Sequence, residues 1–287
     1  MCDEVSASGE AAQLAACGVS RRDFAALGAA AVAAFAAETA AGAPALVETA
    51  VEVPTPDGKA DGWLIHPAAG QHPGILMWPD IAGLREAYRQ MARRLAAAGY
   101  TVLVVNHYYR TARAPLLATM AEWRTPEGAA KLQPAIAAIT PARTLADARA
   151  FLAFLGQQAA TDRHRQLGTC GYCMGGPYAV RTACVSARVG AVASLHGAGL
   201  VSAAPDSPHR LIAQSHARFL FAIARNDDAH APGDKDALRA AAAAAHRPAE
   251  IEVYAADHGW CTIDAPSYNK PEAERAWGRM LALFATL

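Results

Sequence analysis

The residues with the clearest potential for chemistry are five consecutive ones, Gly171-Tyr172-Cys173-Met174-Gly175. They lie between residues 166–170, whose apolar character favours a strand, and residues 175–187, which favour a helix. A strand, a sharp turn and a helix in this order form a nucleophile elbow, which raises one reactive side chain above a sheet. Glycine on both sides permits the tight backbone, and the helix start favours a thiolate. We therefore predict that Cys173 is a nucleophile.

An acyl-transfer nucleophile also needs N–H donors for the oxyanion that forms on the carbonyl oxygen. The residue after the nucleophile supplies one of them in an elbow, and here that residue is Met174. The second donor comes from the loop after an earlier strand, which we expect at residues 74–78. In that loop, Pro79-Asp80-Ile81-Ala82-Gly83-Leu84, the backbone N–H of Ile81 is the candidate.

A cysteine nucleophile needs a base, and the base needs an acid that orients it. His258 follows the predicted strand 249–254 and is the candidate base. Two acids, Asp227 and Asp228, follow the predicted strand 219–224, where they would meet the histidine at one edge of a parallel sheet. We prefer Asp227 because it comes first after the strand, with Asp228 as the alternative. His196, which follows another predicted strand end, is a further candidate for the pocket wall.

Cys170 and Cys173 form a Cys-x-x-Cys pair, which allows a different interpretation. Such pairs occur in thiol–disulfide proteins and in zinc sites. A zinc site needs two more ligands at suitable spacing, and the chain has no second Cys-x-x-Cys and no His-x-x-x-His. We predict no metal and no organic cofactor, and we keep a thiol–disulfide protein that uses both cysteines as an alternative to an acyl hydrolase.

The elements that must position these residues alternate along the chain. Short apolar runs that favour strands are separated by longer helical patterns, which predicts an α/β fold with a doubly wound, mostly parallel sheet and helices on both faces. We expect one domain over residues 46–287, without a large cap domain and with an antiparallel hairpin at its start. The predicted strands are 51–53, 62–66, 74–78, 101–106, 166–170, 190–195, 219–224 and 249–254. The predicted helices are 86–98, 142–155, 175–187, 233–245 and 272–287, with a loop and a short helix in 113–140.

The chain of 287 residues has 26 Lys+Arg and 26 Asp+Glu, so its formal net charge is zero. The absence of a basic excess gives no indication of a nucleic-acid partner. A chain with 53% hydrophobic and 18% charged residues is typical of a soluble globular protein.

The N-terminus resembles a twin-arginine export signal. Arg21 and Arg22 precede an apolar run of small residues, 25–37, and an Ala-x-Ala pattern ends at Ala43. A run of about 13 residues is too short to span a bilayer, so no stable membrane anchor is expected. We predict that residues 1–43 are a leader that engages the twin-arginine export machinery, and that the protein works in the periplasm or outside the cell. If these residues are instead an ordinary amphipathic helix, the protein is cytoplasmic.

Several segments are similar to the dienelactone hydrolase (carboxymethylenebutenolidase) family, over nearly all of residues 47–287. The resemblance implies an α/β-hydrolase fold and a triad of Cys173, Asp227 and His258. The segments that carry it are Met77-Trp78-Pro79-Asp80-Ile81-Ala82-Gly83-Leu84, Leu95-Ala96-Ala97-Ala98-Gly99-Tyr100, Gly171-Tyr172-Cys173-Met174-Gly175-Gly176 and His258-Gly259-Trp260.

The resemblance also concerns activation and substrate binding. Asp80 stands where the family has a glutamate that helps to ionise the cysteine. Arg110 matches one of two arginines that hold the substrate carboxylate, and Thr262 stands where the other is expected. Threonine cannot replace a bidentate arginine, which argues against dienelactone itself as the substrate.

Together these features predict a hydrolase that cleaves a small-molecule carboxylic ester or lactone through a thioester at Cys173. Leaving groups of low basicity, such as enolates and phenolates, are favoured because a thiolate is itself a good leaving group. Another acyl hydrolase of the same fold (a carboxylesterase, a thioesterase or a peptidase) and a binding domain without catalysis are alternatives.

Overall fold

The computed structural model describes residues 29–36 and 44–287. Residues 29–36 are helical, and Phe35 packs under the guanidinium of Arg94, 5.4 Å from its ring centre. The predicted leader falls mostly on residues 1–28 and 37–43, which lie outside the described residues, so the leader and the export that it implies stay predictions. Within the described ranges, no helix combines the length and the apolar character needed to cross a bilayer.

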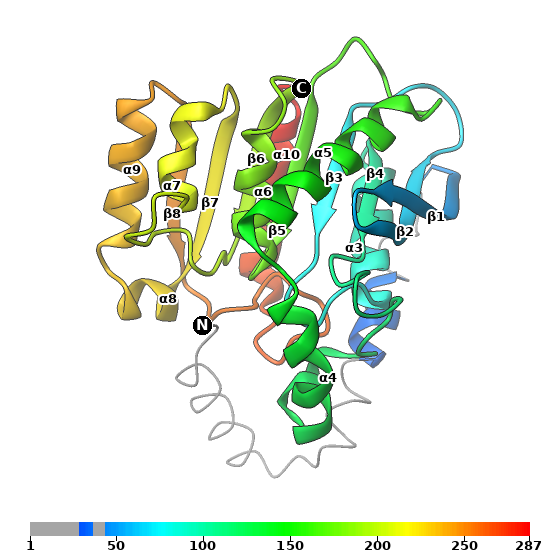
Figure 1. Cartoon of the computed structure of the whole chain (residues 1–287), viewed down its shortest axis with the longest axis horizontal. Helices are drawn as coiled ribbons and strands as arrows, with labels where there is room; N and C mark the ends of the chain where they lie inside the picture. The colour runs from blue at the N-terminus through cyan, green and yellow to red at the C-terminus, as the bar shows by residue number, and fades with distance from the viewer. Residues whose placement is uncertain (1–28, 37–43) are drawn as a thin grey trace.

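The centre of the fold is an eight-stranded sheet in the order β1-β2-β4-β3-β5-β6-β7-β8 (Figure 1). The first two strands form an antiparallel hairpin, β2 is also antiparallel to β4, and all other neighbours are parallel. The predicted fold class is therefore confirmed. The strands are β1 (Leu46–Thr55), β2 (Gly58–Pro67), β3 (Gly74–Trp78), β4 (Thr101–Val105), β5 (Leu167–Tyr172), β6 (Val189–Leu195), β7 (Arg218–Ala224) and β8 (Ala249–Tyr254).

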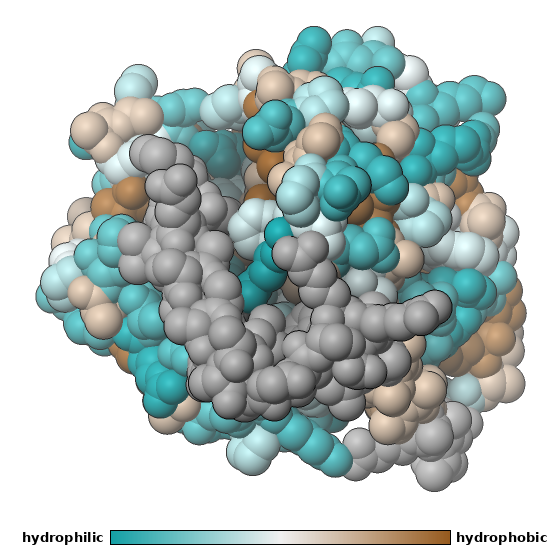
Figure 2. Space-filling model, turned by 90° about the horizontal axis from the view of Figure 1, so that it is seen from below, coloured by the Kyte–Doolittle hydropathy of each residue, from teal (hydrophilic) through white to brown (hydrophobic). Residues whose placement is uncertain are grey.

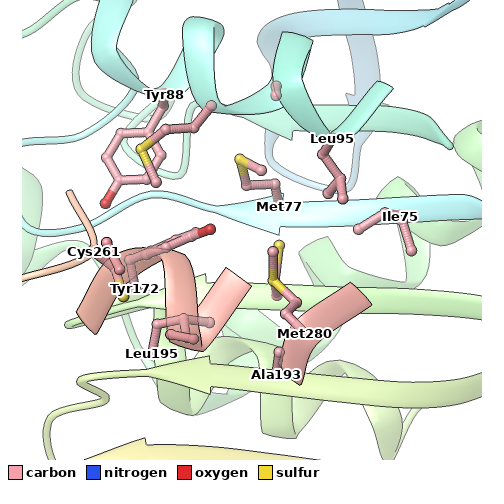
Figure 3. Packing of buried hydrophobic residues seen from close by; sticks show 14 of the residues in the cluster. Ile75, Met77, Tyr88, Leu95, Tyr172, Ala193, Leu195, Cys261 and Met280 are labelled. Carbon is pink, nitrogen blue, oxygen red and sulfur yellow. The ribbon is translucent and has the colours of Figure 1, made fainter. Parts of the chain in front are cut away.

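Helices cover both faces of the sheet. The α-helices are α3 (Glu86–Ala97), α4 (Pro126–Ala137), α5 (Pro141–Gln157), α6 (Gly175–Ala183), α7 (Pro208–Leu211), α8 (Arg225–His230), α9 (Asp234–Ala244) and α10 (Lys270–Phe284). Two 3-10 helices are η1 (Met120–Arg124) and η2 (Ile212–Gln214). Helices α3 and α10 pack on one face, whereas α5, α6 and α9 pack on the other. Figure 3 shows Met77 of β3 between Leu95 of α3 and Met280 of α10.

Burial explains how well each strand is predicted from sequence. Every residue of β3, β4, β5 and β6 is buried, because helices cover both faces of these central strands, and none of the four contains a charged residue. The edge strand β1 has one buried residue, Val53. Its apolar pattern is weak, so the predicted strand 51–53 was too short.

The main differences from the expected elements lie near the carboxyl edge of the sheet. The stretch 113–140, expected to hold a loop and a short helix, contains η1 and the three-turn helix α4. Thr125 caps α4, since its Oγ1 accepts a hydrogen bond from the Gly128 N–H at 3.0 Å. The stretch directly after β7, where no helix is predicted, forms the short helix α8. No large cap domain covers the described part of the fold, as predicted.

Candidate active site

The predicted site residues gather at the edge where the parallel strands end. In Figure 1 this is the lower edge, where α8 and α4 lie. Figure 2 looks at it from outside, and the part drawn in colour mixes hydrophilic residues with smaller hydrophobic patches. Loops that leave the carboxyl ends of parallel strands meet at one place, which is why α/β sheets bind ligands there.

Cys173 occupies a sharp turn between β5 and α6. Its φ of 52° is in the left-handed region, which costs a non-glycine residue roughly 1–2 kcal/mol. The flanking glycines are required sterically: a Cβ on Gly171 would lie 1.9 Å from the Gly175 carbonyl oxygen, and one on Gly175 would lie 2.4 Å from the Trp78 carbonyl oxygen. The elbow predicted from the motif is therefore present, and its compactness explains both glycines.

The backbone of Cys173 is held by hydrogen bonds on both sides. Its N–H is shared between the Leu195 carbonyl oxygen and His196 Nδ1, each at 3.1 Å. Its carbonyl oxygen accepts hydrogen bonds from the Gly176 and Ala198 N–H groups at 3.0 and 3.1 Å. These bonds offset the cost of the left-handed backbone and fix the position of a side chain that is 4% exposed.

His258 and Asp227 form the expected acid–base contact. His258 Nδ1 lies 2.7 Å from Asp227 Oδ2. Because a carboxylate accepts and does not donate, Nδ1 carries the proton, and Nε2 of the neutral ring is the atom that can accept one. The alternative acid, Asp228, binds Lys235 Nζ through both carboxylate oxygens at 2.7 and 2.8 Å. The geometry thus favours Asp227 over Asp228.

The first residues of α8, directly after β7, hold the segment that carries His258. The Arg225 N–H donates to the Ala256 carbonyl oxygen at 3.0 Å, and the Arg225 side chain binds Asp257. Asn226 Oδ1 accepts a hydrogen bond from the His258 N–H at 2.8 Å. Residues 225, 226 and 227 therefore each bind His258 or one of the two residues before it. We refer to these contacts as the 225–227 clasp.

His196 lies directly behind the nucleophile and the base. Its ring is 1% exposed and makes an edge-to-face contact with the His258 ring, with 5.0 Å between ring centres. Burial, together with the neighbouring His258, lowers the pKa of His196 well below its usual range, so the ring stays neutral. A neutral Nδ1 is what the Cys173 N–H requires as an acceptor.

One cavity of about 160 Å³ brings the main predicted residues together. Cys173, Asp227 and His258 all line it, and so does His196, as expected from its place after a strand. The remaining wall comes from the loop after β3, from η1, from the α8 region and from the loop after His258. Its residues include Ile81, Met120, Trp123, Arg124, His230, Asp234 and Ser267.

The two expected oxyanion donors, Ile81 and Met174, lie close to each other. Neither N–H donates a hydrogen bond to another described residue. The Tyr108 hydroxyl donates to the Ile81 carbonyl oxygen at 2.8 Å and contacts the Met174 sulfur at 3.4 Å. Tyr108 therefore holds the peptide that follows Ile81 and links the two loops. The two N–H groups are available for an oxyanion, which is the role expected of them.

A buried charge cluster ties three walls of the cavity together. Arg85 donates two hydrogen bonds to Asp264, both at 2.7 Å, and two to Asp80, at 2.7 and 3.0 Å. Asp80 also accepts the Ala82 N–H, and Asp264 also accepts the Met120 N–H. The buried guanidinium of Arg85 thus connects the loop that carries Ile81 to the loop after His258, and Asp264 connects both to η1. Burial opposes the charge of Arg85, but the two carboxylates raise its pKa above the usual range.

We expect Arg85→Met to destabilise the fold by about 3–5 kcal/mol, because it leaves two buried carboxylates without their cation. The free energy of unfolding in urea measures this. Lys235→Met, which removes the partner of Asp228 from an ion pair that solvent reaches, should cost about 1 kcal/mol or less. Equal losses in the two variants would show that the Arg85 cluster contributes no more than a surface ion pair.

This cluster also decides where Asp80 lies. Both of its carboxylate oxygens bind Arg85, and Asp80 does not line the cavity that holds Cys173. These contacts give no support to the role expected from the family glutamate. Asp80 instead orders the loop that carries Ile81.

The residues expected to bind a substrate carboxylate also lie elsewhere. Arg110 binds Asp147 with two nitrogens and Asp57 with the third, each at 2.7 Å, and it does not line the cavity. Thr262 is fully buried and contacts the Tyr88 hydroxyl at 3.3 Å. The expected role of Arg110 is therefore not supported by its position. The arginine that lines the cavity is Arg124, on η1.

The first cysteine of the Cys-x-x-Cys pair, Cys170, does not line the cavity. Cys170 is a fully buried β5 residue packed in the core between α3, α10 and the sheet, and burial raises the pKa of its thiol far above the usual range. Both cysteines are free thiols. Among the described residues, no group of three or more His, Cys, Asp or Glu side chains is placed to hold a metal ion.

Comparisons with known proteins agree with this architecture. A putative carboxymethylenebutenolidase of Synechocystis sp. is 28% identical over 243 residues, which is 83% of this chain and 96% of the relative. A probable 2-oxo-3-(5-oxofuran-2-ylidene)propanoate lactonase of Bradyrhizobium sp. is 29% identical over 170 residues, 58% of this chain and 60% of the relative. The crystal structure of a putative dienelactone hydrolase from Klebsiella pneumoniae has a TM-score of 0.73 at 24% identity, covering 85% of this chain and all of that one.

A model of the dienelactone hydrolase family matches residues 60–287. The match includes the elbow, both candidate acids and His258. It covers far more than half of the sequence. The chain therefore belongs to the dienelactone hydrolase family and is an ester or lactone hydrolase.

Proposed function

We propose that the enzyme hydrolyses a small-molecule carboxylic ester or lactone through Cys173, His258 and Asp227, with a thioester as the intermediate. The observation that carries the proposal is the meeting of these three residues at one cavity, with the 2.7 Å contact between His258 and Asp227. An acid, an imidazole and a thiol at one strand edge form the arrangement that acyl transfer requires.

In the first half of the reaction, His258 Nε2 takes the thiol proton and the Cys173 sulfur attacks the carbonyl carbon. The carbonyl oxygen becomes an oxyanion, to which the N–H groups of Ile81 and Met174 donate. A carbon–sulfur bond forms, the bond to the leaving oxygen breaks, and the imidazolium gives its proton to that oxygen. Asp227 keeps Nδ1 protonated and stabilises the imidazolium.

In the second half, His258 takes a proton from water, and the resulting hydroxide attacks the thioester carbon. The carbon–sulfur bond breaks, the acid is released, and the proton returns to the sulfur. Since a thiolate is a good leaving group, the first half favours leaving oxygens of low basicity, such as phenolates or the enolate of an enol lactone. These steps use side chains, backbone N–H groups and water.

The proposal assigns structural roles to Asp80 and Arg110. Asp80 is engaged by Arg85, so thiolate formation depends on His258 and on the helix start at Met174. Arg110 is engaged by Asp147 and Asp57. A substrate held by two arginines at the family positions is therefore not part of the proposal.

The experiment that tests the proposal is trapping of the intermediate. Enzyme mixed with p-nitrophenyl hexanoate and quenched in acid within milliseconds should carry one hexanoyl group, located by mass spectrometry on the peptide that contains Cys173. A burst of p-nitrophenol close to the enzyme concentration should accompany it. Turnover without any acylated peptide, or acylation of a different residue, would contradict the thioester at Cys173.

A further inference from the structure

A second cavity adjoins the one that holds Cys173 and His258. Its volume is about 410 Å³, and it lies between η1, α4 and the start of α6. The two cavities share four wall residues: Ile81, Trp123, Ala198 and Gly199. They are therefore two lobes of one cleft, which we name the reactive lobe and the α4 lobe.

The walls of the two lobes differ in chemistry. The reactive lobe has charged or titratable side chains, among them Arg124, His230 and Asp234. The α4 lobe has no charged side chain in its wall within the described residues, and its polar side chains are Gln133 and Tyr178. The apolar residues in its wall include Trp123, Leu132, Ile136, Met174 and Pro177. Such a wall gains free energy by covering an apolar group.

The position of the proposed base decides which part of a substrate enters each lobe. His258 must protonate the leaving oxygen, so the leaving group has to lie on the His258 side, in the reactive lobe. The two oxyanion donors, Ile81 and Met174, both line the α4 lobe. The carbonyl carbon thus sits at the junction of the lobes, and its other substituent, the acyl chain, points away from His258.

We propose that the α4 lobe is the acyl subsite, and that the substrates are esters or lactones of hydrophobic carboxylic acids with a more polar leaving portion. This inference rests on the proposed function. The acyl arm is aromatic or a medium-length alkyl chain. A lobe of about 410 Å³ is in the size range of small-molecule pockets, so it has room for a group of that size.

The test is a series of p-nitrophenyl esters that share one leaving group: acetate, butanoate and hexanoate. Burying one methylene group is expected to raise kcat/KM roughly three- to fourfold, so hexanoate should exceed acetate by about a hundredfold or more. A parallel series of phenyl acetates, in which a para-alkyl group on the leaving phenol grows instead, should show a much weaker dependence on length.

Variants of α4 test whether the dependence of kcat/KM on acyl length arises in the α4 lobe. Ile136, which is partly buried, lines the α4 lobe, and Ile136→Trp should reverse the preference so that acetate becomes the better ester. Gln133→Trp, at an exposed position of the same wall, gives a second obstruction that does not depend on repacking the interior. Ala137→Trp is the matched control, because Ala137 is exposed on α4 and does not line the lobe. It should keep the preference of the wild type.

The outcomes separate this inference from the proposed function. Turnover of all three esters with no dependence on acyl length would overturn the acyl subsite and leave the hydrolase mechanism standing. A dependence on the length of the alkyl group on the leaving phenol, with a flat acyl series, would overturn it as well. If no ester is turned over and Cys173 is not acylated, the proposed function fails and the inference fails with it.

Discussion

Alanine in place of Cys173 is expected to lower kcat/KM for p-nitrophenyl esters by a factor on the order of 10⁴ or more, the scale on which loss of a nucleophile acts. The sulfur is the atom that forms the bond to the acyl group, and His258 cannot replace it from its own position in the cavity. Steady-state release of p-nitrophenol measures the loss. Circular dichroism and the urea midpoint should show that the variant is folded.

The matched control for this variant is Cys170→Ala, three residues earlier on β5. Cys170 is buried in the core with a thiol whose pKa is raised, so its loss should affect packing and leave kcat/KM within a few fold of the wild type. Equal losses in the two variants would favour chemistry that needs both thiols, as in a thiol–disulfide protein. Full activity in Cys173→Ala would exclude this residue as the nucleophile.

Asparagine in place of Asp227 should produce the second large effect, a fall in kcat of about 10³–10⁴, as expected when the residue that orients a catalytic histidine can no longer fix its tautomer. The carboxylate that holds the proton on Nδ1 is lost, and an amide can donate to that nitrogen instead. The ring is then free to place its proton on Nε2, the nitrogen proposed to accept the thiol proton, and Nε2 could no longer act as a base. The measurement is kcat for a p-nitrophenyl ester.

The chain supplies a matched comparison, because Asp228 is adjacent and has the same side chain. Asp228 binds Lys235 and does not line the cavity, so Asp228→Asn should keep kcat within about threefold of the wild type. If Asp228→Asn is the more damaging of the two changes, the acid has been assigned to the wrong residue.

The site is predicted well from the sequence where its geometry is local. The elbow at Cys173 follows from two glycines within five residues, and the positions of Asp227 and His258 follow from the two predicted strands, β7 and β8, that precede them. Parallel strands all end at one edge, so residues just beyond them converge although they are far apart in sequence. These predictions require only the order of the strands and helices along the chain, and no knowledge of side-chain contacts.

The sequence is less informative where a contact joins distant loops. Asp264 and Arg85 are separated by 179 positions, and neither belongs to a periodic pattern, so their pairing has no local signal. That pair, together with Asp80, is also why the expected activating role of Asp80 has no support in the structure. Arg110 is similar: its motif is recognisable, but its partners, Asp57 and Asp147, lie in separate segments and decide where its guanidinium points.

The 225–227 clasp has a consequence for how this enzyme can change. Asp227 and His258 contact each other directly, just beyond the carboxyl ends of the neighbouring strands β7 and β8. Their contact does not involve residues 231–248, which form the connection between the two strands. That connection can therefore lengthen, shorten or exchange its helix while the catalytic spacing persists. This part of the cleft rim can therefore acquire new substrate contacts without changing the distance between Asp227 and His258.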